Sequence, residues 1–338
     1  MPRAPHLLLA GFLLLIASAL LGLALGPSAL APQHLAVALL GPAEDSPAWM
    51  RAVVIDVRLP RVLLAIALGA TLAQTGVVLQ ALFRNPLAEQ SLLGLSGGAA
   101  LAAALWLVLA PSLVVGLVAH QPWALPLAAT VGALLAGALV IRLSRSTGFT
   151  DMATLLLVGV SINALAGAGI ALLQTLANDA ALRDLTIWLY GSLGRAGWTE
   201  LSLGLPLLIA IALWLPREAR ALDALLLGEA EATHLGVQVE PLKRRLLLLV
   251  ALAAATAVAL AGIIGFIGLI VPHLLRRWIG PGHTRLLPAA GLFGAALLVL
   301  ADTAARTVFA PLEVPVGVLT ALLGVPLFLA LLRRRGLG

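Results

Sequence analysis

The chain has 338 residues, of which 61% are hydrophobic and only 11% are charged, and its mean hydropathy is +1.07. A soluble domain carries about twice that charged fraction, so the composition excludes an ordinary soluble protein and indicates lipid as the solvent. The net charge of +6 does not indicate nucleic acid, because the basic residues lie in loops between apolar runs without interleaved aromatic residues. Cysteine is absent, which excludes disulfides, thiolate metal sites and cysteine catalysis.

Apolar runs of roughly 20 residues predict an all-α, polytopic membrane protein with ten spans. The runs cover residues 7–25, 62–82, 92–114, 122–142, 152–176, 200–216, 244–263, 265–280, 286–303 and 316–332. The first run could instead be a signal peptide cleaved near Ala29-Leu30-Ala31, but its length favours a retained span. Residues 26–56 contain four prolines and are predicted to form a polar external loop.

The boundary between the seventh and eighth spans lies where glycines and a proline interrupt a nearly continuous apolar run. Gly262, Gly265 and Gly268 predict a tight external turn there. A short helix that ends at His273 should follow this turn.

The distribution of basic residues predicts the orientation. With the N-terminus inside, 15 of the 21 Lys and Arg residues fall in cytoplasmic segments and six fall outside. The cytoplasmic set is Arg3, Arg84, Arg142, Arg145, Arg217, Arg220, Lys243, Arg244, Arg245, Arg276, Arg277, Arg285 and Arg333 to Arg335, and the external set is Arg51, Arg58, Arg61, Arg183, Arg195 and Arg306. This bias predicts that both termini are cytoplasmic.

Residues 217–245 form the one long polar interruption late in the chain, with five basic and five acidic residues. Two short helices are predicted, Glu218–Leu227 and Glu229–Leu235. The residues that define them are Leu222, Leu225 and Leu226 on one apolar side, Glu229 and Glu231 in the first turn of the second helix, and Gly228 and Gly236 as punctuation. The stretch is either a partner-docking surface or an interfacial amphipathic linker.

Candidate catalytic chemistry is sparse. Gly94-Leu95-Ser96-Gly97-Gly98 matches a nucleophile pattern, but the six histidines fall in loops or at span ends, so glycines that ease a helix start explain it better. No phosphate-binding G-x-x-x-x-G-K loop surrounds Lys243, the only lysine, so the chain cannot use ATP by itself. No span has a charged residue near its midpoint, which argues against an ion-coupled secondary carrier.

Two further patterns each allow two interpretations from the sequence. Small residues at helical spacing lie in the fifth span at Gly159, Asn163 and Gly167 and in the tenth at Gly317, Ala321 and Gly324, and they indicate either close helix packing or a pathway lining. The external arginines Arg58, Arg61 and Arg306 are either interfacial anchors or a site for an acidic partner.

Four long stretches resemble the iron-siderophore, haem and vitamin B12 permeases of binding-protein-dependent ABC importers. They are RLPRVLLAIALGATLAQTGVVLQALFRNPLAEQSLLGLSGG at 58–98, GFIGLIVPHLLRR at 265–277, LLPAAGLFGAALLVLADTAAR at 286–306 and PLEVPVGVLTALLGVPLF at 311–328. The resemblance implies one permease domain over residues 1–338 with the type II ABC importer fold, in a bacterial inner membrane. It also implies a homodimer with two cytoplasmic ATPase subunits and a periplasmic binding protein, no permanently bound cofactor, and ATP use by the partner.

The same resemblance implies roles for the patterns above. Arg58, Arg61 and Arg306 would receive acidic residues of the binding protein, and Leu222 to Val237, within a cytoplasmic segment 217–243, would be the coupling helix pair. The fifth and tenth spans, with a short external helix around Asp179 to Trp188, would line the pathway.

Two segments look most like the haem permeases, LRDLTIWLYGSLG at 182–194 and LGEAEATHLGVQVEPLKRR at 227–245. In a two-fold dimer, paired copies of Arg183 could face haem propionates. Cobalamin and ferric siderophores remain alternatives. No histidine or tyrosine is placed to ligate iron within the spans, so passage without coordination and no metal site are expected.

Overall fold

The computed structural model describes residues 3–28, 30–42, 47–113, 121, 123–146 and 149–333. Residue 29 of the signal-cleavage pattern lies outside these ranges, as do the end of the third predicted span and the first residue of the fourth. Within the described residues, the regular secondary structure is helical apart from two short antiparallel strands that pair Arg145 with Thr150.

The elements in chain order are α1 (Arg3–Ala24), α2 (Pro32–Leu40), α3 (Ala48–Ala52), the π-helical turn η2 (Val53–Arg58), α4 (Leu59–Leu82), the 3₁₀ turn η3 (Gln90–Leu93), α5 (Leu95–Leu113), α7 (Ala124–Leu143), β1 (Arg145–Ser146), β2 (Phe149–Thr150), α8 (Met152–Leu176), α9 (Asp179–Leu189), α10 (Trp198–Trp214), the 3₁₀ turn η4 (Leu215–Glu218), α11 (Ala219–Leu225), α12 (Glu229–His234), α13 (Val239–Ala261), α14 (Ile267–Ile279), α15 (His283–Thr307) and α16 (Val316–Arg333).

Ten of these helices match the ten predicted runs, and they are α1, α4, α5, α7, α8, α10, α13, α14, α15 and α16. Seven helical stretches of the described chain are long and apolar enough to cross a membrane, while Leu95–Ala110 and Val316–Leu327 are shorter apolar helices. The prediction of an all-α, polytopic membrane protein is therefore confirmed.

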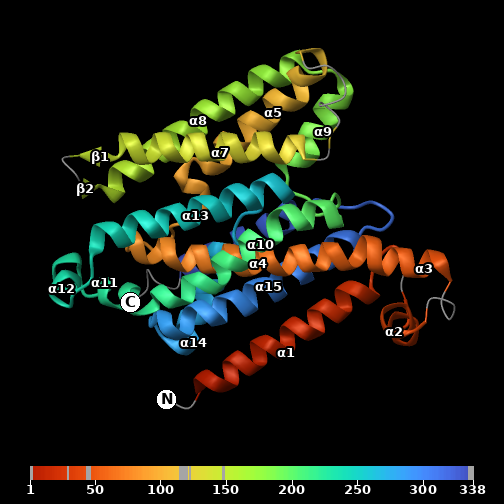
Figure 1. Cartoon of the computed structure of the whole chain (residues 1–338), viewed down its shortest axis with the longest axis horizontal. Coiled ribbons are helices and arrows are strands. Elements are labelled where there is room, and N and C mark those ends of the chain that lie inside the picture. Colours follow the sequence, from red (N-terminus) through yellow and green to blue (C-terminus); the bar gives the residue numbers. More distant parts are fainter. Residues whose placement is uncertain are drawn as a thin grey trace.

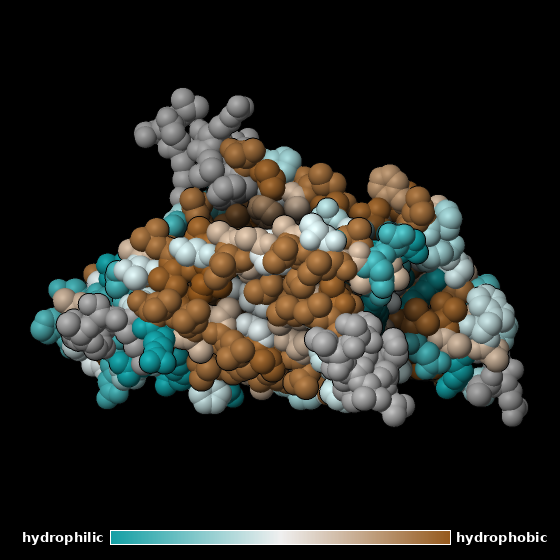
Figure 2. Space-filling view, turned by 90° about the horizontal axis from the view of Figure 1, so that it is seen from above, coloured by the Kyte–Doolittle hydropathy of each residue, from teal (hydrophilic) through white to brown (hydrophobic). Residues whose placement is uncertain are grey.

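The long helices run roughly side by side, as a bilayer-spanning bundle requires (Figure 1). Helices α5, α7 and α8 form one layer, α13, α10, α4 and α15 lie next to it, and α1 covers the opposite side. The start of α1 lies at the same end of the bundle as α11, α12 and the two strands, whereas α2, α3 and α9 lie at the other end. Figure 2 shows a broad apolar surface across the middle of the molecule with hydrophilic residues at both ends.

Helix α4 is the centre of the bundle, since it contacts α15, α14, α10 and α13. Two glycines allow this close packing. A Cβ on Gly69 would lie 2.3 Å from the carbonyl oxygen of Gly294 in α15, and one on Gly76 would lie 2.0 Å from that of Gly268 in α14. Any larger residue would push the helices apart, which is the usual role of small residues between membrane helices.

The predicted break between the seventh and eighth spans is present, but the helix after it is longer than expected. Helix α14 continues to Ile279 rather than ending at His273, although Pro272 lies inside it. Proline removes the hydrogen bond to the carbonyl four residues earlier, here that of Gly268. Gln80 of α4 donates its side-chain Nε2 to this oxygen at 3.1 Å, so the carbonyl is satisfied and the helix persists.

A partly buried acid caps the start of α14. Phe266, in the left-handed conformation with φ 69°, donates its backbone N–H to Glu89 Oε1 at 2.7 Å. Burial raises the pKa of Glu89, and the hydrogen bond from Phe266 opposes that rise. The preceding residues 262–265 are not helical, so this carboxyl replaces backbone bonds that a continuous helix would make.

The expectation of a polar external loop over 26–56 is wrong in its structure. Helices α2 and α3 occupy much of it, and α3, η2 and α4 join into one stretch from Ala48 to Leu82. Pro32 begins α2, a position where its missing N–H costs nothing. The π-helical turn lies directly before Pro60, which cannot donate to a carbonyl in the preceding turn, and the widened turn accommodates this proline.

Candidate functional site

The polar segment between α10 and α13 folds into the two predicted short helices. Helix α11 covers Ala219–Leu225 and α12 covers Glu229–His234. Gly228 adopts φ +126° and Gly236 adopts φ +86°, so both glycines occupy conformations that side chains disfavour. The prediction that Gly228 and Gly236 interrupt the two short helices is confirmed.

The apolar side of this segment is divided differently from the prediction. Leu222 and Leu225 are fully buried against the bundle, where they anchor α11. Leu226 is 47% exposed, and Leu227 and Leu235, which the sequence reading did not single out, are 67% and 64% exposed. We name Leu226, Leu227 and Leu235, together with the exposed Glu231 between them, the inner face.

Ion pairs hold this segment rigidly on α13. Lys243 Nζ lies 2.7 Å from Glu229 Oε2 and 3.2 Å from Glu240 Oε1, and its side chain is only 5% exposed. Arg245 Nη2 lies 2.7 Å from Glu218 Oε2. Glu229 therefore ties α12 to α13, in addition to lying in the first turn of α12 as predicted.

A second connection runs from α11 to α15. The carboxylate of Asp223 accepts the backbone N–H of His283 at 2.7 Å and lies 2.8 Å from His283 Nδ1. Thr284 Oγ1 also donates to Asp223, at 3.2 Å. Asp223 thus caps the N-terminus of α15 from a different helix, and a movement of α11 would pull directly on α15.

At the opposite end of the bundle, Arg58 is buried and binds the end of α1. Its Nη1 donates to the carbonyl oxygens of Leu23 at 2.8 Å and Ala24 at 2.9 Å, and its Nη2 donates to Ser28. A guanidinium here satisfies terminal carbonyls and complements the negative end of the helix dipole.

The other two arginines that were predicted to be external join the same cluster. Arg61 binds Asp302 through Nε, at 3.0 and 2.9 Å, and through Nη2 at 2.7 Å, and its Nη2 also binds Glu313. Arg306 donates to the carbonyl of Gly22, and its Nε lies 3.5 Å from Asp302 Oδ2. The three guanidinium groups face two carboxylates, so the cluster keeps a net positive charge. We call Arg58, Arg61, Asp302, Arg306 and Glu313 the outer cluster.

The small residues of α8 mostly pack inward. A Cβ on Gly159 would lie 2.1 Å from the carbonyl oxygen of Leu92. Asn163 donates from Nδ2 to the carbonyl of Ser91 at 2.7 Å and accepts the N–H of Gly97 at 3.2 Å. The Asn163 amide, which needs hydrogen-bond partners in hydrocarbon, has one partner in η3 and one in the first turn of α5.

Gly167 differs from these two residues, because nothing lies within 4 Å of a Cβ built on it. Around it, α8 exposes Leu157, Leu165 and Leu172, each more than 60% accessible. The face of α8 that is free in this chain therefore contains only one of the three predicted small residues.

The stripe on α16 also packs against the chain itself. A Cβ on Gly317 would lie 2.2 Å from the carbonyl oxygen of Tyr190, and one on Gly324 would lie 2.7 Å from Phe266 Cβ. Ala321, between them, is half-buried. For Gly159, Asn163, Gly317 and Gly324, the geometry fits the packing alternative.

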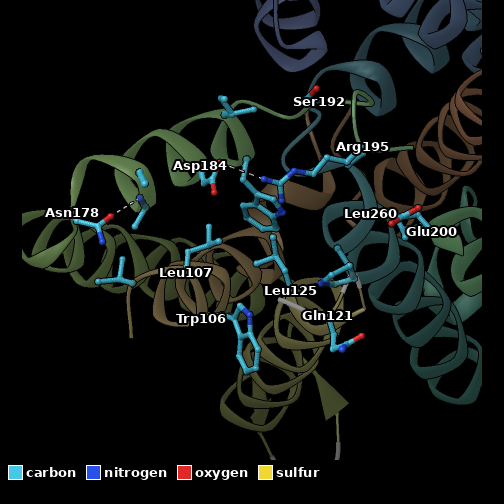
Figure 3. Close-up of a pocket in the computed structure, with 18 residues that line it drawn as sticks. Trp106, Leu107, Gln121, Leu125, Asn178, Asp184, Ser192, Arg195, Glu200 and Leu260 are labelled. Atoms are coloured by element: carbon cyan, nitrogen blue, oxygen red, sulfur yellow. Dashed lines mark hydrogen bonds and ion pairs between the residues drawn. The ribbon is translucent and has the colours of Figure 1, made fainter. Parts of the chain in front are cut away.

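Helix α9 lies over a cavity of about 840 Å³ at the end of the bundle that also holds α2 and α3 (Figures 1 and 3). Trp106, Leu125 and Trp188 supply apolar walls, and Asp184 pairs with Arg195 at 3.5 Å across its mouth. Arg183, exposed on α9, does not line this cavity.

No group of three or more His, Cys, Asp or Glu residues that could hold a metal ion occurs in the described part of the chain. Ser96 lies in the first turn of α5, which begins directly after Gly94, and the φ of +74° at Gly94 ends the preceding 3₁₀ turn. This geometry fits the interpretation that glycines ease the start of a helix.

Comparison with known proteins decides the family. The model of the FecCD transport family matches residues 14–334. This chain belongs to the FecCD transport family. It is therefore a permease of the ABC importer type, and the multi-pass membrane architecture follows from both the family and the helices.

Individual FecCD-type relatives cover nearly the whole chain. The hemin transport system permease protein HmuU of Yersinia pestis is 45% identical over 333 residues, covering 98% of this chain and 96% of that protein. The cobalamin import system permease protein BtuC of Halobacterium salinarum is 42% identical and covers 86% of this chain and 75% of its own length. A solved structure described as an inward-facing conformation of a metal-chelate type ABC transporter matches with a TM-score of 0.85 at 32% identity, covering 98% of this chain and 99% of that one.

Sequence reasoning missed several residues of this FecCD-family permease. Leu227 lies five residues after Leu222, so a helical projection of α11 could have shown that it faces away from Leu222. Leu235 carried no such signal, because it ends α12, a separate helix beyond Gly228. Asp223 and Glu313 carried no local signal, because their partners lie 60 and 252 residues away along the chain.

Proposed function

We propose that this FecCD-family permease imports haem as a homodimer, together with two ATPase subunits and a substrate-binding protein. The observation that carries the substrate is the 45% identity, over 98% of the chain, to a hemin permease. The cobalamin permease is only slightly less similar, so cobalamin is the competing substrate. We place the protein in the cytoplasmic membrane of a bacterium, which is the inner membrane where there are two, with both termini in the cytoplasm.

The inner face supports an ATPase-docking role. It presents three exposed leucines on a segment that ion pairs fix to α13 and that Asp223 fixes to α15. A rigid lever of this kind can convert closure of the ATPase subunits into helix movement, which a flexible loop could not do. The basic residues Arg217, Lys243 and Arg245 flank it, in agreement with a cytoplasmic location.

The exposed apolar surfaces of α8 and α16 support a homodimer with the pathway between its subunits. Leu157, Leu165 and Leu172 on α8 and Leu322 and Leu323 on α16 are all exposed. Gly167 gives α8 a small residue on this surface, which lets a second backbone approach closely. In this arrangement the dimer face consists of Gly167 and its exposed neighbours, while the other small residues hold each subunit together.

Arg183 supports an anionic substrate. It is exposed on α9, the short helix that follows α8 at the outer end. Two copies related by a two-fold axis would present two guanidinium groups at the mouth of the pathway, and haem carries two propionates.

Transport by the reconstituted complex tests the proposal. The permease, its ATPase and its binding protein are placed in proteoliposomes, and uptake of haem, cobalamin and a ferric siderophore is measured with and without ATP. We expect ATP-dependent uptake of haem in preference to the other two, and vanadate should abolish it. Preferred uptake of cobalamin or the siderophore would replace haem, and uptake driven by an ion gradient without ATP would contradict the importer mechanism.

A further inference from the structure

The loop between α15 and α16 places an acidic side chain on the outer cluster. Glu313 lies nine residues before Leu322 of α16 and contacts Arg61 Nη2, next to the contact that Arg61 makes with Asp302. A Cβ on Gly194, in the loop after α9, would lie 3.4 Å from Glu313 Oε1, so the carboxylate sits between two outer loops.

The two carboxylates on Arg61 differ in how they are held. The side chain of Asp302 is 2% exposed, and both of its oxygens contact Arg61. The side chain of Glu313 is 42% exposed, and its contact to Arg61 is its one ion pair among the described residues. Glu313 can therefore swing into water at small cost, whereas removing Asp302 would leave buried guanidinium groups without their charge partner.

The same loop exposes apolar side chains. Val308, Phe309 and Leu312 are 60–74% exposed, and they precede Glu313 directly in the chain. Protein interfaces concentrate their binding energy in apolar and arginine side chains that become desolvated together. A docking surface for an acidic protein patch combines a positively charged cluster with apolar residues around it. The outer cluster and the apolar residues that precede Glu313 have this combination.

We propose that Glu313 occupies, in the free permease, the position on Arg61 that a carboxylate of the substrate-binding protein takes on docking. The incoming acid displaces Glu313, the loop 308–313 moves outward, and its apolar residues pack against the partner. This inference rests on the proposed function, because it requires a binding protein that docks on the outer cluster. It also explains how buried arginines can serve a partner at all: one movable side chain covers Arg61.

Affinity measurements test the displacement. Binding of the substrate-binding protein to the complete transporter in nanodiscs is measured for wild type, Glu313→Gln and Asp56→Asn. Asp56 is an exposed acid at the same end that lies five residues before Arg61, so its variant removes the same charge without uncovering the guanidinium. We expect binding about three- to tenfold tighter for Glu313→Gln and unchanged for Asp56→Asn, since only the first removes a competitor.

Unchanged or weaker binding by Glu313→Gln overturns the inference, and equal tightening by Asp56→Asn does the same, because it would reduce the effect to overall charge. Arg61→Lys separates this failure from failure of the docking site. Weaker binding by Arg61→Lys with no effect of Glu313→Gln leaves the docking site in place. If both variants bind as wild type does, the partner docks elsewhere.

Loop movement supplies a second measurement that does not depend on Arg61 variants. The chain has no cysteine, so Leu312→Cys carries a spin label at a single position. Adding the binding protein should change the mobility of this label and protect the site from soluble thiol reagents. An unchanged spectrum and unchanged reactivity in a complex shown to have formed would contradict the displacement.

Discussion

Helices α4 and α8 have the same mean hydropathy, 2.1, over their most apolar 18 residues. They differ in how much of that stretch is buried by the rest of the chain. In this chain 83% of the α4 window is buried and only 17% of the α8 window is. Hydropathy therefore predicts that a helix crosses the membrane but not what it contacts there, because lipid and a neighbouring helix are equally apolar.

The difference lies in the polar residues. Within α4, Thr71 Oγ1 lies 3.4 Å from the carbonyl of Leu208 in α10, and Gln74 Nε2 lies 3.3 Å from that of Leu287 in α15. Together with Gln80 these side chains bond to three neighbouring helices. Polar groups in hydrocarbon need partners, so a helix that carries several of them is held at the centre. Helix α8 turns leucines outward and keeps Asn163 against its own subunit.

The sharpest test of this contrast substitutes one glycine on each helix. Gly76→Val should prevent formation of a monodisperse permease, because the added atoms would overlap the α14 backbone and cost more than the about 1–3 kcal/mol typical of overpacking. Gly167→Val should leave the subunit folded, since that position is open. Size-exclusion chromatography and thermal unfolding in detergent report both results. Comparable stability of the two variants would break the comparison.

The same contrast exists between leucines of the inner segment. Leu222→Ala should lower the free energy of unfolding by about 2–5 kcal/mol, as for other buried leucines. Leu227→Ala should barely change stability but weaken ATPase binding by roughly tenfold, the effect expected for an exposed interface anchor. Co-purification of the ATPase and coupled haem uptake are measured for each. An intact ATPase complex with Leu227→Ala, Leu226→Ala and Leu235→Ala combined would place the docking surface elsewhere.

Arg183 provides a test at the proposed external opening of the pathway, where α9 follows the exposed helix α8. Arg183→Ala should slow haem uptake about three- to tenfold while complex assembly stays intact, because an exposed cation contributes to substrate attraction and not to folding. Arg195→Ala, which removes a cation that lines the cavity beside α9, is the matched control. Equal uptake by wild type and Arg183→Ala would remove Arg183 from the pathway.

The smallest effect concerns two acidic helix caps. Burial raises the pKa of Glu89, so its contribution to stability is full below the usual glutamate pKa and is lost as pH rises through the raised value. Hydrogen bonds from Thr154 and Ala153 lower the pKa of exposed Asp151, the cap of α8, so its contribution is present above the usual aspartate pKa and is lost as pH falls.

We measure the difference in unfolding temperature between wild type and each of Glu89→Gln and Asp151→Asn from about pH 3 to pH 7. This difference should change with pH in opposite directions for the two variants. Asp151→Asn should lose its difference from wild type at the acid end. If both differences change with pH in the same direction, the two carboxyl groups are in similar surroundings, which would contradict the structure.

Much of the fold was predictable because its signals are local. The apolar runs, the two short inner helices, and the glycines at 228 and 236 each depend on neighbours within a few residues. The motifs at 58–98 and 265–277 resembled the correct family for the same reason. The errors arose where a distant side chain intervened, as when Gln80 lets α14 continue past Pro272.

By itself, the sequence determined that this protein spans the membrane about ten times, which segment projects from the bundle, and to which family it belongs. Those properties follow from hydropathy, helix-ending residues and long motifs, none of which needs a contact. Only the tertiary structure decided that Arg58, Arg61 and Arg306 are buried on their own chain, that Leu227 faces outward while Leu222 faces inward, and that Glu313 covers Arg61. Side-chain direction and charge pairing depend on residues up to 284 positions apart, which meet only once the helices have packed.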